Sequence, residues 1–277
     1  MDTNSSIICK NCGNHFNGNY CNVCGEKVYG LKDKSIWHLF EEAFHFLSHF
    51  EGKLLHTVRT MFSQPGRFSA DYCDGIRKKY FRPSSLFLLI VVLYLLFPFA
   101  RGLNLNIGDH VHSWYGDKAR QAALQYMARH RIDEAELVAR YNASSEKVSK
   151  ILLFLLIPVM AGFAALFTVR RKRAFFDHLI FSIETNGFFV LWGFLIVPLL
   201  LRLISLLVKI PERTDIYTLP VIITACLVYV FLAARRFYGF SQLKAGLFSV
   251  LFMTILPLFA HYIYSCILFF VTINVLH

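Results

Sequence analysis

Charged side chains are scarce in this chain: they make up 17% of its 277 residues, and 18 acidic residues stand against 29 basic ones. Hydrophobic residues make up 56%, a share that soluble domains seldom reach and that bundles of membrane helices commonly show. The composition therefore argues against a soluble domain. We expect most of the apolar surface to face lipid.

The sequence also lacks the short motifs that carry common enzyme chemistry. It contains no Gly-x-x-x-x-Gly-Lys phosphate loop, no His-Glu-x-x-His helix and no Gly-x-Ser-x-Gly elbow. We therefore expect no enzymatic activity. The first thirty residues contain no apolar stretch of the signal-peptide kind, so we expect the amino terminus to stay in the cytosol.

Four cysteines near the amino terminus form two Cys-x-x-Cys-Gly pairs, Cys9 with Cys12 and Cys21 with Cys24. This spacing is typical of four thiolates around one tetrahedral Zn²⁺, with a turn at Gly18 between the two pairs. Four sulfur ligands leave no open coordination position, so the expected zinc is structural. Two disulfides are the alternative, but such pairs without a secretory signal favour metal or redox use.

Five apolar runs have the length that a helix needs to cross the hydrocarbon layer, which is about twenty residues. The runs cover residues 84–101, 151–169, 179–201, 217–234 and 246–273. The sequence thus predicts an all-α integral membrane helix bundle of about five transmembrane helices, with a small amino-terminal zinc ribbon built on the four cysteines.

Basic residues in the short flanks predict the orientation of these helices. The cytosolic clusters would be Arg77 to Arg82 before the first run, Arg170 to Arg173 after the second, and Arg235, Arg236 and Lys244 between the last two. All of them agree with a cytosolic amino terminus and an extracytoplasmic carboxyl terminus. The net charge of +11 then reflects topology and attraction to anionic lipid, and we expect no nucleic-acid partner.

The domain organisation follows from these boundaries. We expect a zinc ribbon over residues 1–30, cytosolic amphipathic helices and a juxtamembrane segment over 31–83, and a transmembrane domain over 84–277. A polar insert over 104–149 would lie outside, with helical patterns at 117–130 and from 133 to near 142. Its apolar content predicts a cap on the membrane surface without a core of its own.

A second metal or proton site is a weaker hypothesis. His38, His45 and His49 share one stripe of the amphipathic helix expected after Ser35, and His178, just before the third apolar run, is the candidate for a further ligand from elsewhere in the chain. The plainer interpretation places these imidazoles with the aromatic residues at the membrane interface.

Ionisable residues within membrane helices are costly, so they favour protein or water as their surroundings. Glu184, Asn186 and His261 are the candidates for an intramembrane polar site. They predict either a polar path between helices or hydrogen bonds that fix the bundle.

The segment that leads into the first apolar run has a distinctive pattern: Pro65-Gly66-Arg67, then Tyr72, Gly75, Arg77, Lys78, Lys79, Tyr80, Phe81 and Pro83. Its expected role is anchoring at the membrane surface. Arg77, Lys78, Lys79 and Arg82 would bind lipid phosphates while Tyr80 and Phe81 lie at headgroup depth. Cys73, within the same segment, is expected to be a small interfacial residue rather than a nucleophile.

Together with the cysteine pairs and the apolar runs, this pattern resembles the bacterial family catalogued as domain of unknown function 3667. The likeness continues at 176–182 and 236–241. The resemblance implies a multi-pass protein of the bacterial inner membrane with an amino-terminal zinc ribbon, and it implies no activity. It also implies histidines six and eight residues after His178, where this chain has Glu184 and Asn186.

The leading functional hypothesis is a non-enzymatic membrane protein whose zinc ribbon docks a cytosolic protein or the membrane surface. The alternative is a small permease or lipid-handling transporter with a polar path around Glu184 and His261. The expected partners are the lipid bilayer and a cytosolic protein; the sequence says nothing of oligomeric state.

Overall fold

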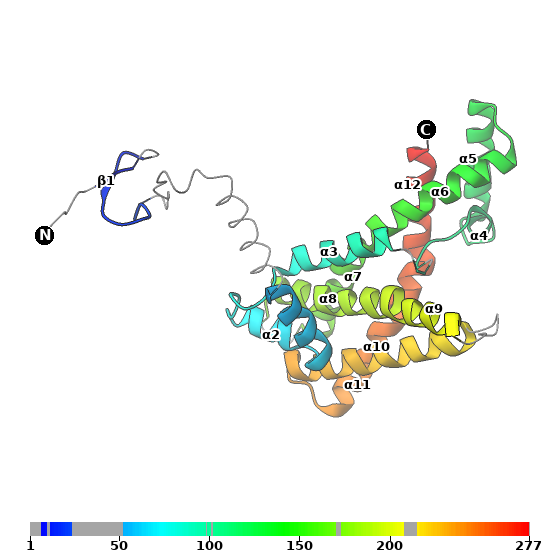
Figure 1. The fold of residues 1–277 in the computed structure, drawn as a ribbon. Helices are drawn as coiled ribbons and strands as arrows, with labels where there is room; N and C mark the ends of the chain where they lie inside the picture. Colours follow the sequence, from blue (N-terminus) through cyan, green and yellow to red (C-terminus); the bar gives the residue numbers. More distant parts are fainter. Residues whose placement is uncertain are drawn as a thin grey trace, which may run out of the picture. The chain divides into compact units, whose positions relative to one another are not determined.

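The computed structural model describes residues 7–9, 12–23, 52–97, 99–100, 102–169, 173–207 and 215–276. The chain divides into two compact units, Met1–Gly52 and Lys53–His277 (Figure 1). Each unit is described by itself below. The helix expected after Ser35, with His38, His45 and His49, lies outside the described residues, as does Cys24.

The first unit is a small ribbon. Its two strands, β1 (Ile7–Ile8) and β2 (His15–Phe16), pair antiparallel, with Ile7 opposite Phe16 and Ile8 opposite His15. The first cysteine pair lies in the connection between the strands, where the amide of Cys9 donates to the carbonyl of Asn14 at 2.8 Å. Phe16 packs with Cys9 and Cys21 in the only small apolar cluster of the described part of this unit.

Helices are the regular elements of the second unit within its described residues, and turns and loops connect them. A first helix runs through residues 52–63. It is followed by α2 (Arg67–Cys73), α3 (Pro83–Leu96), α4 (Ile107–Val111), α5 (Gly116–His130), α6 (Glu134–Leu152), η2 (Leu153–Leu155), α7 (Leu156–Phe167), α8 (Phe175–Val190), η3 (Leu191–Ile196), α9 (Val197–Leu207), α10 (Asp215–Tyr238), α11 (Gln242–Phe259), η4 (Ala260–Tyr264) and α12 (Ser265–Val275).

Four helical stretches are long and apolar enough to span a membrane: Glu134–Phe167, Phe175–Leu207, Thr218–Tyr238 and Gln242–Val275. The expected all-α membrane bundle is therefore confirmed. The first apolar run also forms a helix, α3, but its 14 residues reach only about 21 Å at 1.5 Å per residue. Pro98 disfavours a helical residue before it, and Phe97 accordingly leaves the helical region with ψ 74°.

Two of the long helices change their winding where a proline removes a backbone donor. Pro158 has no N–H group to donate to the carbonyl of Phe154, and the 3-10 helix η2 lies at that place. Pro198 likewise leaves the carbonyl of Phe194 without its usual N–H donor, and the π-helix η3 lies at that place. The helices continue through both turns because the following residues resume helical geometry.

The polar insert differs from the expectation. The helix expected to end near Asn142 instead continues as α6 into α7, giving one stretch of 34 residues or about 51 Å. The insert also takes part in a core: Ile107, Tyr115, Leu137 and Tyr141 pack against Phe269 and Ile273 of α12. We call α4, α5, the first half of α6 and the end of α12 the cap.

Two separate parts of the chain share this core, for a physical reason. The insert alone has too little apolar surface, and α12 supplies the missing part from a run that the sequence assigns to the fifth membrane helix. The hydroxyl of Tyr126 donates to the carbonyl of Leu276, and Trp114 donates to the carbonyl of Tyr262, which ties the cap further to η4 and α12.

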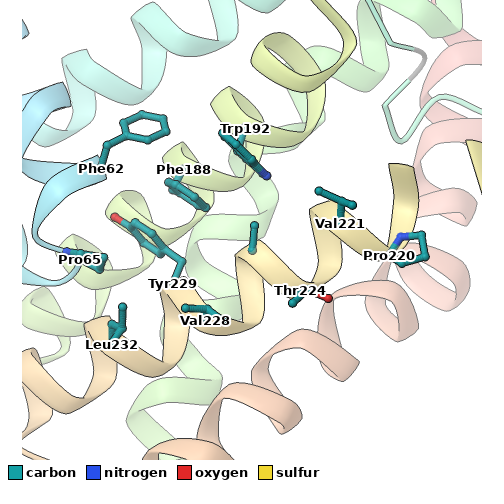
Figure 2. A pocket seen from close by; sticks show the side chains of 11 residues that line it. Phe62, Pro65, Phe188, Trp192, Pro220, Val221, Thr224, Val228, Tyr229 and Leu232 are labelled. Carbon is teal, nitrogen blue, oxygen red and sulfur yellow. The ribbon is translucent and has the colours of Figure 1, made fainter. Parts of the chain in front are cut away.

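An open apolar groove lies on the side of the bundle between the helix at 52–63, α8 with η3, and α10 (Figure 2). Its volume is about 630 Å³. The rings of Phe62, Phe188 and Trp192 form one wall and Val221, Val228 and Leu232 of α10 the other.

Candidate functional site

Three stretches that are distant in sequence meet at one end of the second unit: the segment 65–83, the start of α8 and the end of α10. Glu184 of α8 bonds to Gly66 and Ser69, Arg236 of α10 bonds to Pro65, and His178 of α8 bonds to Tyr238. We call residues 65–83 the box segment. These stretches carry the three patterns of the family resemblance, and the fold brings them together.

Glu184 is the centre of this arrangement. Its carboxyl group is fully buried and accepts the amides of Gly66 and Ser69, each at 2.8 Å, and the hydroxyls of Ser69 and Tyr229. The two amides belong to the first turn of α2, where backbone donors have no helical partner and the helix dipole favours negative charge. Glu184 therefore caps α2 from another helix.

Gly66 is required at the start of α2 for two reasons. Its φ of 78° lies in the left-handed region, which costs other residues roughly 1–2 kcal/mol. A Cβ atom at this position would also lie 2.5 Å from the carbonyl oxygen of Ala233 in α10. The box segment thus lies directly on the backbone of α10, and only glycine permits that approach.

Two arginines fix the end of α10 and the start of α8. The guanidinium group of Arg236 donates to the carbonyl of Pro65 at 2.7 Å, and Arg173 donates to the carbonyl of Phe237 at 2.8 Å. Arg173 also lies 4.3 Å above the ring of Phe237 and 3.8 Å from Asp177. These contacts satisfy backbone carbonyls at places where the chain enters or leaves a helix.

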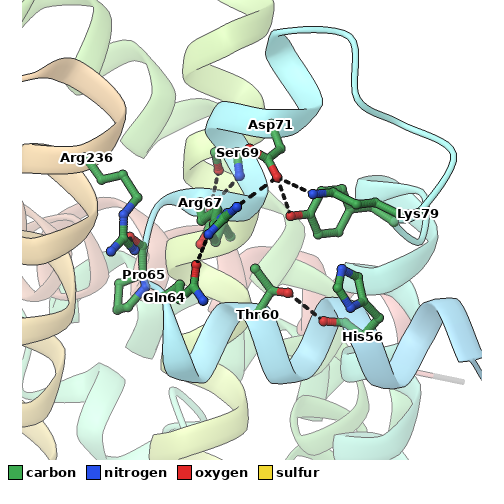
Figure 3. A network of polar contacts seen from close by, with 11 residues as sticks. His56, Thr60, Gln64, Pro65, Arg67, Ser69, Asp71, Lys79 and Arg236 are labelled. Carbon is green, nitrogen blue, oxygen red and sulfur yellow. Dashed lines mark hydrogen bonds and ion pairs between the residues drawn. The ribbon is translucent and has the colours of Figure 1, made fainter.

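Asp71 joins α2 to the later part of the box segment. It accepts the hydroxyl of Tyr80 at 2.7 Å and pairs with Lys79 at 2.6 Å (Figure 3). Burial by itself would raise the pKa of Asp71, but the hydrogen bonds from Lys79 and Tyr80 outweigh it and hold the pKa below its ordinary value. The carboxylate stays charged at neutral pH and closes the box segment on itself.

The expected position of Tyr80 and Phe81 at the membrane surface is corrected by their burial. Tyr80 is 4% exposed and packs against Phe68, and Phe81 is 7% exposed. The amide of Phe81 also bonds to the hydroxyl of Thr57 at 2.8 Å. The aromatic pair belongs to the protein core because the box segment folds back on the bundle. The basic residues Arg77, Lys78, Lys79 and Arg82 are exposed, and lipid anchoring by them stays a prediction.

His178 has partners for both ring nitrogens. Nδ1 lies 2.8 Å from the hydroxyl of Tyr238, and Nε2 lies 3.5 Å from that of Thr168. The side chain is 3% exposed. Among the described residues it joins no group of three or more metal-binding side chains, and its expected partners His38, His45 and His49 lie outside them.

Cys73 lies beside the same end of the bundle. Burial, with further contributions from the neighbouring Asp177 carboxylate, raises the pKa of Cys73 to about 12. The thiol stays protonated at neutral pH, and a protonated thiol is a poor nucleophile. This agrees with the interpretation of Cys73 as a small interfacial residue.

The structure does not bring Glu184, Asn186 and His261 together. Asn186 lies on another face of α8 than Glu184, since residues two apart do not share a face, and its amide nitrogen donates to Ser182. The carboxamide oxygen of Asn186 is buried without a hydrogen-bond partner. His261 is exposed on η4, with its ring against Tyr262.

The cysteine cluster of the first unit fits a metal ion. The sulfur atoms of Cys9, Cys12 and Cys21 lie within 4.8 Å of one another, and those of Cys12 and Cys21 are 3.6 Å apart. Four thiolates at the usual zinc distance would be separated by about 3.8 Å. Three of the four expected ligands are therefore close enough to hold a metal ion.

Sequence reasoning missed most of the partners. Ser69 and Tyr229 carry no signal that links them to Glu184, because a partner in a remote helix leaves no periodicity. His110 was missed as well: it is fully buried in the cap, with Nδ1 2.5 Å from the hydroxyl of Tyr115 and Nε2 2.9 Å from that of Tyr141. The core that the insert shares with α12 was not predicted, and without it there was no place for such a histidine.

Comparison with known proteins identifies the part of the chain that holds this site. Residues 51–95 match the sequence model of a family described as Protein of unknown function (DUF3667). The resemblance to this family is thereby confirmed. The matched residues contain the helix at 52–63, the box segment and α3, which include all the partners that Glu184 has outside α10. Neither the curated proteins nor the solved structures include a match to the chain.

Proposed function

We propose that this chain is a non-enzymatic, multi-pass protein of the bacterial inner membrane whose zinc ribbon is a docking module for a cytosolic protein. The apolar helices of the second unit supply the membrane anchor. The proposal concerns the ribbon because large apolar side chains are exposed on its surface.

The observation that carries the proposal is the exposed apolar surface of the ribbon. Ile8, Tyr20 and Val23 are 59%, 62% and 68% exposed, whereas Phe16 is buried. A metal-stabilised module that needs no larger core can present such side chains to a partner. Clusters of exposed apolar residues are typical of protein interaction sites.

The metal we propose is Zn²⁺, with Cys24 as the fourth ligand. The spacing of the two cysteine pairs and the sulfur separations of the first three ligands support it. A complete set of four thiolates would make the ion structural. Metal binding would then hold the fold of the ribbon, since roughly 10–16 kcal/mol is available from such sites.

The proposed orientation places the ribbon in the cytosol. Its support is the meeting of three positively charged flanks at one end of the second unit, where Arg236 bonds to Pro65 and Arg173 bonds to Phe237. Basic flanks favour the cytosolic side of the membrane. The cap then lies on the extracytoplasmic side.

The alternative of a permease has less support. A transport path needs polar groups that face a shared passage, but the carboxyl group of Glu184 already accepts four hydrogen bonds from protein donors. His261 is exposed on a different helix segment. Bonds that fix the bundle account for Glu184 without transport.

The test separates metal binding from docking in the full-length protein. A triple variant, Ile8→Ser with Tyr20→Ser and Val23→Ser, keeps every cysteine; Asn19→Ser is the matched polar control. A photo-crosslinking amino acid at the exposed residue 22 would report contacts of the ribbon in intact membranes. We expect one zinc per chain in both variants, and a defined protein adduct in the control that the triple variant loses.

Two results would contradict the proposal. Zinc content that persists after all four cysteines are replaced by serine would remove the metal assignment. A protein adduct of the same mass and yield in the triple variant and in the Asn19→Ser control would show that the exposed apolar side chains have no role in docking.

A further inference from the structure

The groove beside α10 has a face with two chemically different parts. Val221, Ala225, Val228 and Leu232 follow one another at steps of three and four residues, so they share one side of the helix. The same side continues to Arg235, seven residues after Val228, and Arg236 is its neighbour. Both arginines are exposed. The groove is therefore apolar along its length and positively charged at one end.

The length of the apolar part corresponds to one leaflet of a membrane. From Pro220 to Leu232 the helix rises by twelve residues, or roughly 18 Å at 1.5 Å per residue. Half of the hydrocarbon layer is about 15 Å thick. One acyl chain of a lipid can lie along the groove with its headgroup beside the arginines.

The walls of the groove have fixed positions that suit an acyl chain. Phe188 stacks on Tyr229 with ring centroids 3.7 Å apart, and Phe62 packs against Phe188 at 5.2 Å. Tyr229 is held in turn by its hydrogen bond to Glu184. The aromatic wall is thus fixed by the same carboxyl group that caps α2, whereas the opposite wall exposes small and branched side chains of α10 (Figure 2).

The charged end is held in place as well. Arg236 uses one nitrogen for the carbonyl of Pro65, a residue that itself lines the groove. Its remaining donors form a fork that suits a phosphate group. Arg235 lies one turn beyond Leu232 on the same side of α10 and adds a second positive charge.

We propose that this groove binds an anionic phospholipid of the leaflet on the side of Arg235 and Arg236, with one acyl chain along α10 and the phosphate group at the two arginines. The assignment goes beyond docking by the ribbon and is independent of it. Charge complementarity selects this occupant: a second protein helix would bring no phosphate group to Arg235 and Arg236, and a lipid without net charge would leave their two positive charges unbalanced.

Trp192 offers a direct probe, because its ring lines the groove. The full chain has three tryptophans, and the variant with Trp37→Phe and Trp114→Phe keeps only Trp192. This variant is reconstituted into neutral vesicles that contain a small fraction of lipid brominated on its acyl chain. The brominated lipid is either phosphatidylglycerol or phosphatidylcholine, and the quenching of Trp192 fluorescence reports the lipid in the groove.

We expect stronger quenching by brominated phosphatidylglycerol. One arginine near a membrane surface contributes about 1 kcal/mol to the attraction of anionic lipid, so Arg235→Gln should lower the preference about fivefold. Lys244→Gln, at the same end of the neighbouring helix α11, is the matched control and should keep the preference. Val228→Phe fills the groove and should reduce quenching by both lipids.

Equal quenching by the two lipids in the parent variant would overturn the proposal, because the groove would then be ordinary lipid-facing surface. An equal loss of preference in Lys244→Gln and Arg235→Gln would overturn it too, since it would show a general surface charge. Quenching that is absent with both lipids, or unchanged in Val228→Phe, would overturn it by showing that another part of the protein or a second copy covers the groove.

Discussion

Glu184 and His110 are fully buried ionisable side chains at different ends of the membrane bundle, and their hydrogen bonds are satisfied in opposite ways. At one end Glu184 accepts hydrogen bonds from the backbone of the box segment, so it fixes where a piece of chain lies. At the other end His110 lies between the hydroxyls of Tyr115 and Tyr141, so it links side chains within the cap. Loss of the first should detach a segment, whereas loss of the second should loosen a core.

Removal of the Glu184 carboxyl group should have the largest effect. In Glu184→Ala, two backbone amides and two hydroxyls lose their acceptor in a buried place, and we expect the free energy of unfolding to fall by roughly 3–4 kcal/mol. Unfolding with dodecyl sulfate in mixed micelles measures it. Glu136→Ala, at an exposed pair on α6, should change it by less than about 0.5 kcal/mol. Similar losses in both variants would refute the capping of α2 by Glu184.

A side chain at Gly66 should be the next most damaging change to the same end. Gly66→Ala combines a left-handed φ with a Cβ atom 2.5 Å from the Ala233 carbonyl, and we expect a loss of about 2–4 kcal/mol. Gly246→Ala in α11, where no atom lies within 4 Å of the new Cβ, should be neutral or stabilising. Equal stability of the two variants would contradict the close approach of the box segment to α10.

The cap should respond to pH through His110. Burial lowers the pKa of His110 from 6.5 to about 4, so the folded state holds the neutral ring while the unfolded chain takes up a proton below 6.5. Stability is therefore complete above pH 6.5 and falls as the pH drops toward 4, by about 1–3 kcal/mol.

Unfolding curves at pH 7.5 and 5 for the parent protein and for His110→Phe measure this contribution. The variant should be less stable at pH 7.5 and should lose less stability on acidification than the parent. An identical pH dependence in both proteins would show that the imidazole between the tyrosines does not titrate as its burial requires.

The smallest effect should come from the rim of the box segment. Tyr80→Phe keeps the packing against Phe68 and removes the hydrogen bond to Asp71, so we expect a loss of about 1 kcal/mol. Tyr20→Phe on the ribbon is a matched control with an exposed ring. A loss as large as that of Glu184→Ala would place the main attachment of the box segment at Asp71 instead.

The sequence predicts the bundle well because the hydrophobic runs are set by membrane thickness alone. The apolar runs at 179–201 and 246–273 lie wholly in helices long enough to span, and those at 151–169 and 217–234 do so except for one or two end residues. The 14-residue helix α3 and the cap core were not foreseen. In both cases the outcome depends on neighbours: Pro98 ends α3 early, and Phe269 joins the cap because α12 extends past the length that the membrane needs.

Prediction of the candidate site from the sequence is limited in the same way, because the outcome depends on neighbours in the fold. Glu184 stands out in the sequence because a carboxyl group within a membrane helix is costly, and the structure gives it protein partners as that cost requires. The hydrogen bonds by which Glu184 caps the start of α2 could not be predicted from the sequence, since Gly66 and Ser69 lie more than a hundred residues away. Tyr80 was misplaced for the opposite reason, because an aromatic residue beside basic ones has the pattern of a membrane anchor even where the chain folds back.

Hydrogen exchange of the box segment tests most directly whether Glu184 holds it on the bundle. Peptides that cover residues 64–73 are compared in the full-length protein and in Glu184→Gln, with peptides from the cap as an internal reference. The account predicts exchange that is faster by about tenfold or more at 64–73, a loss of about 1.4 kcal/mol in local stability, with the cap unchanged. Unchanged protection of residues 64–73 would contradict it.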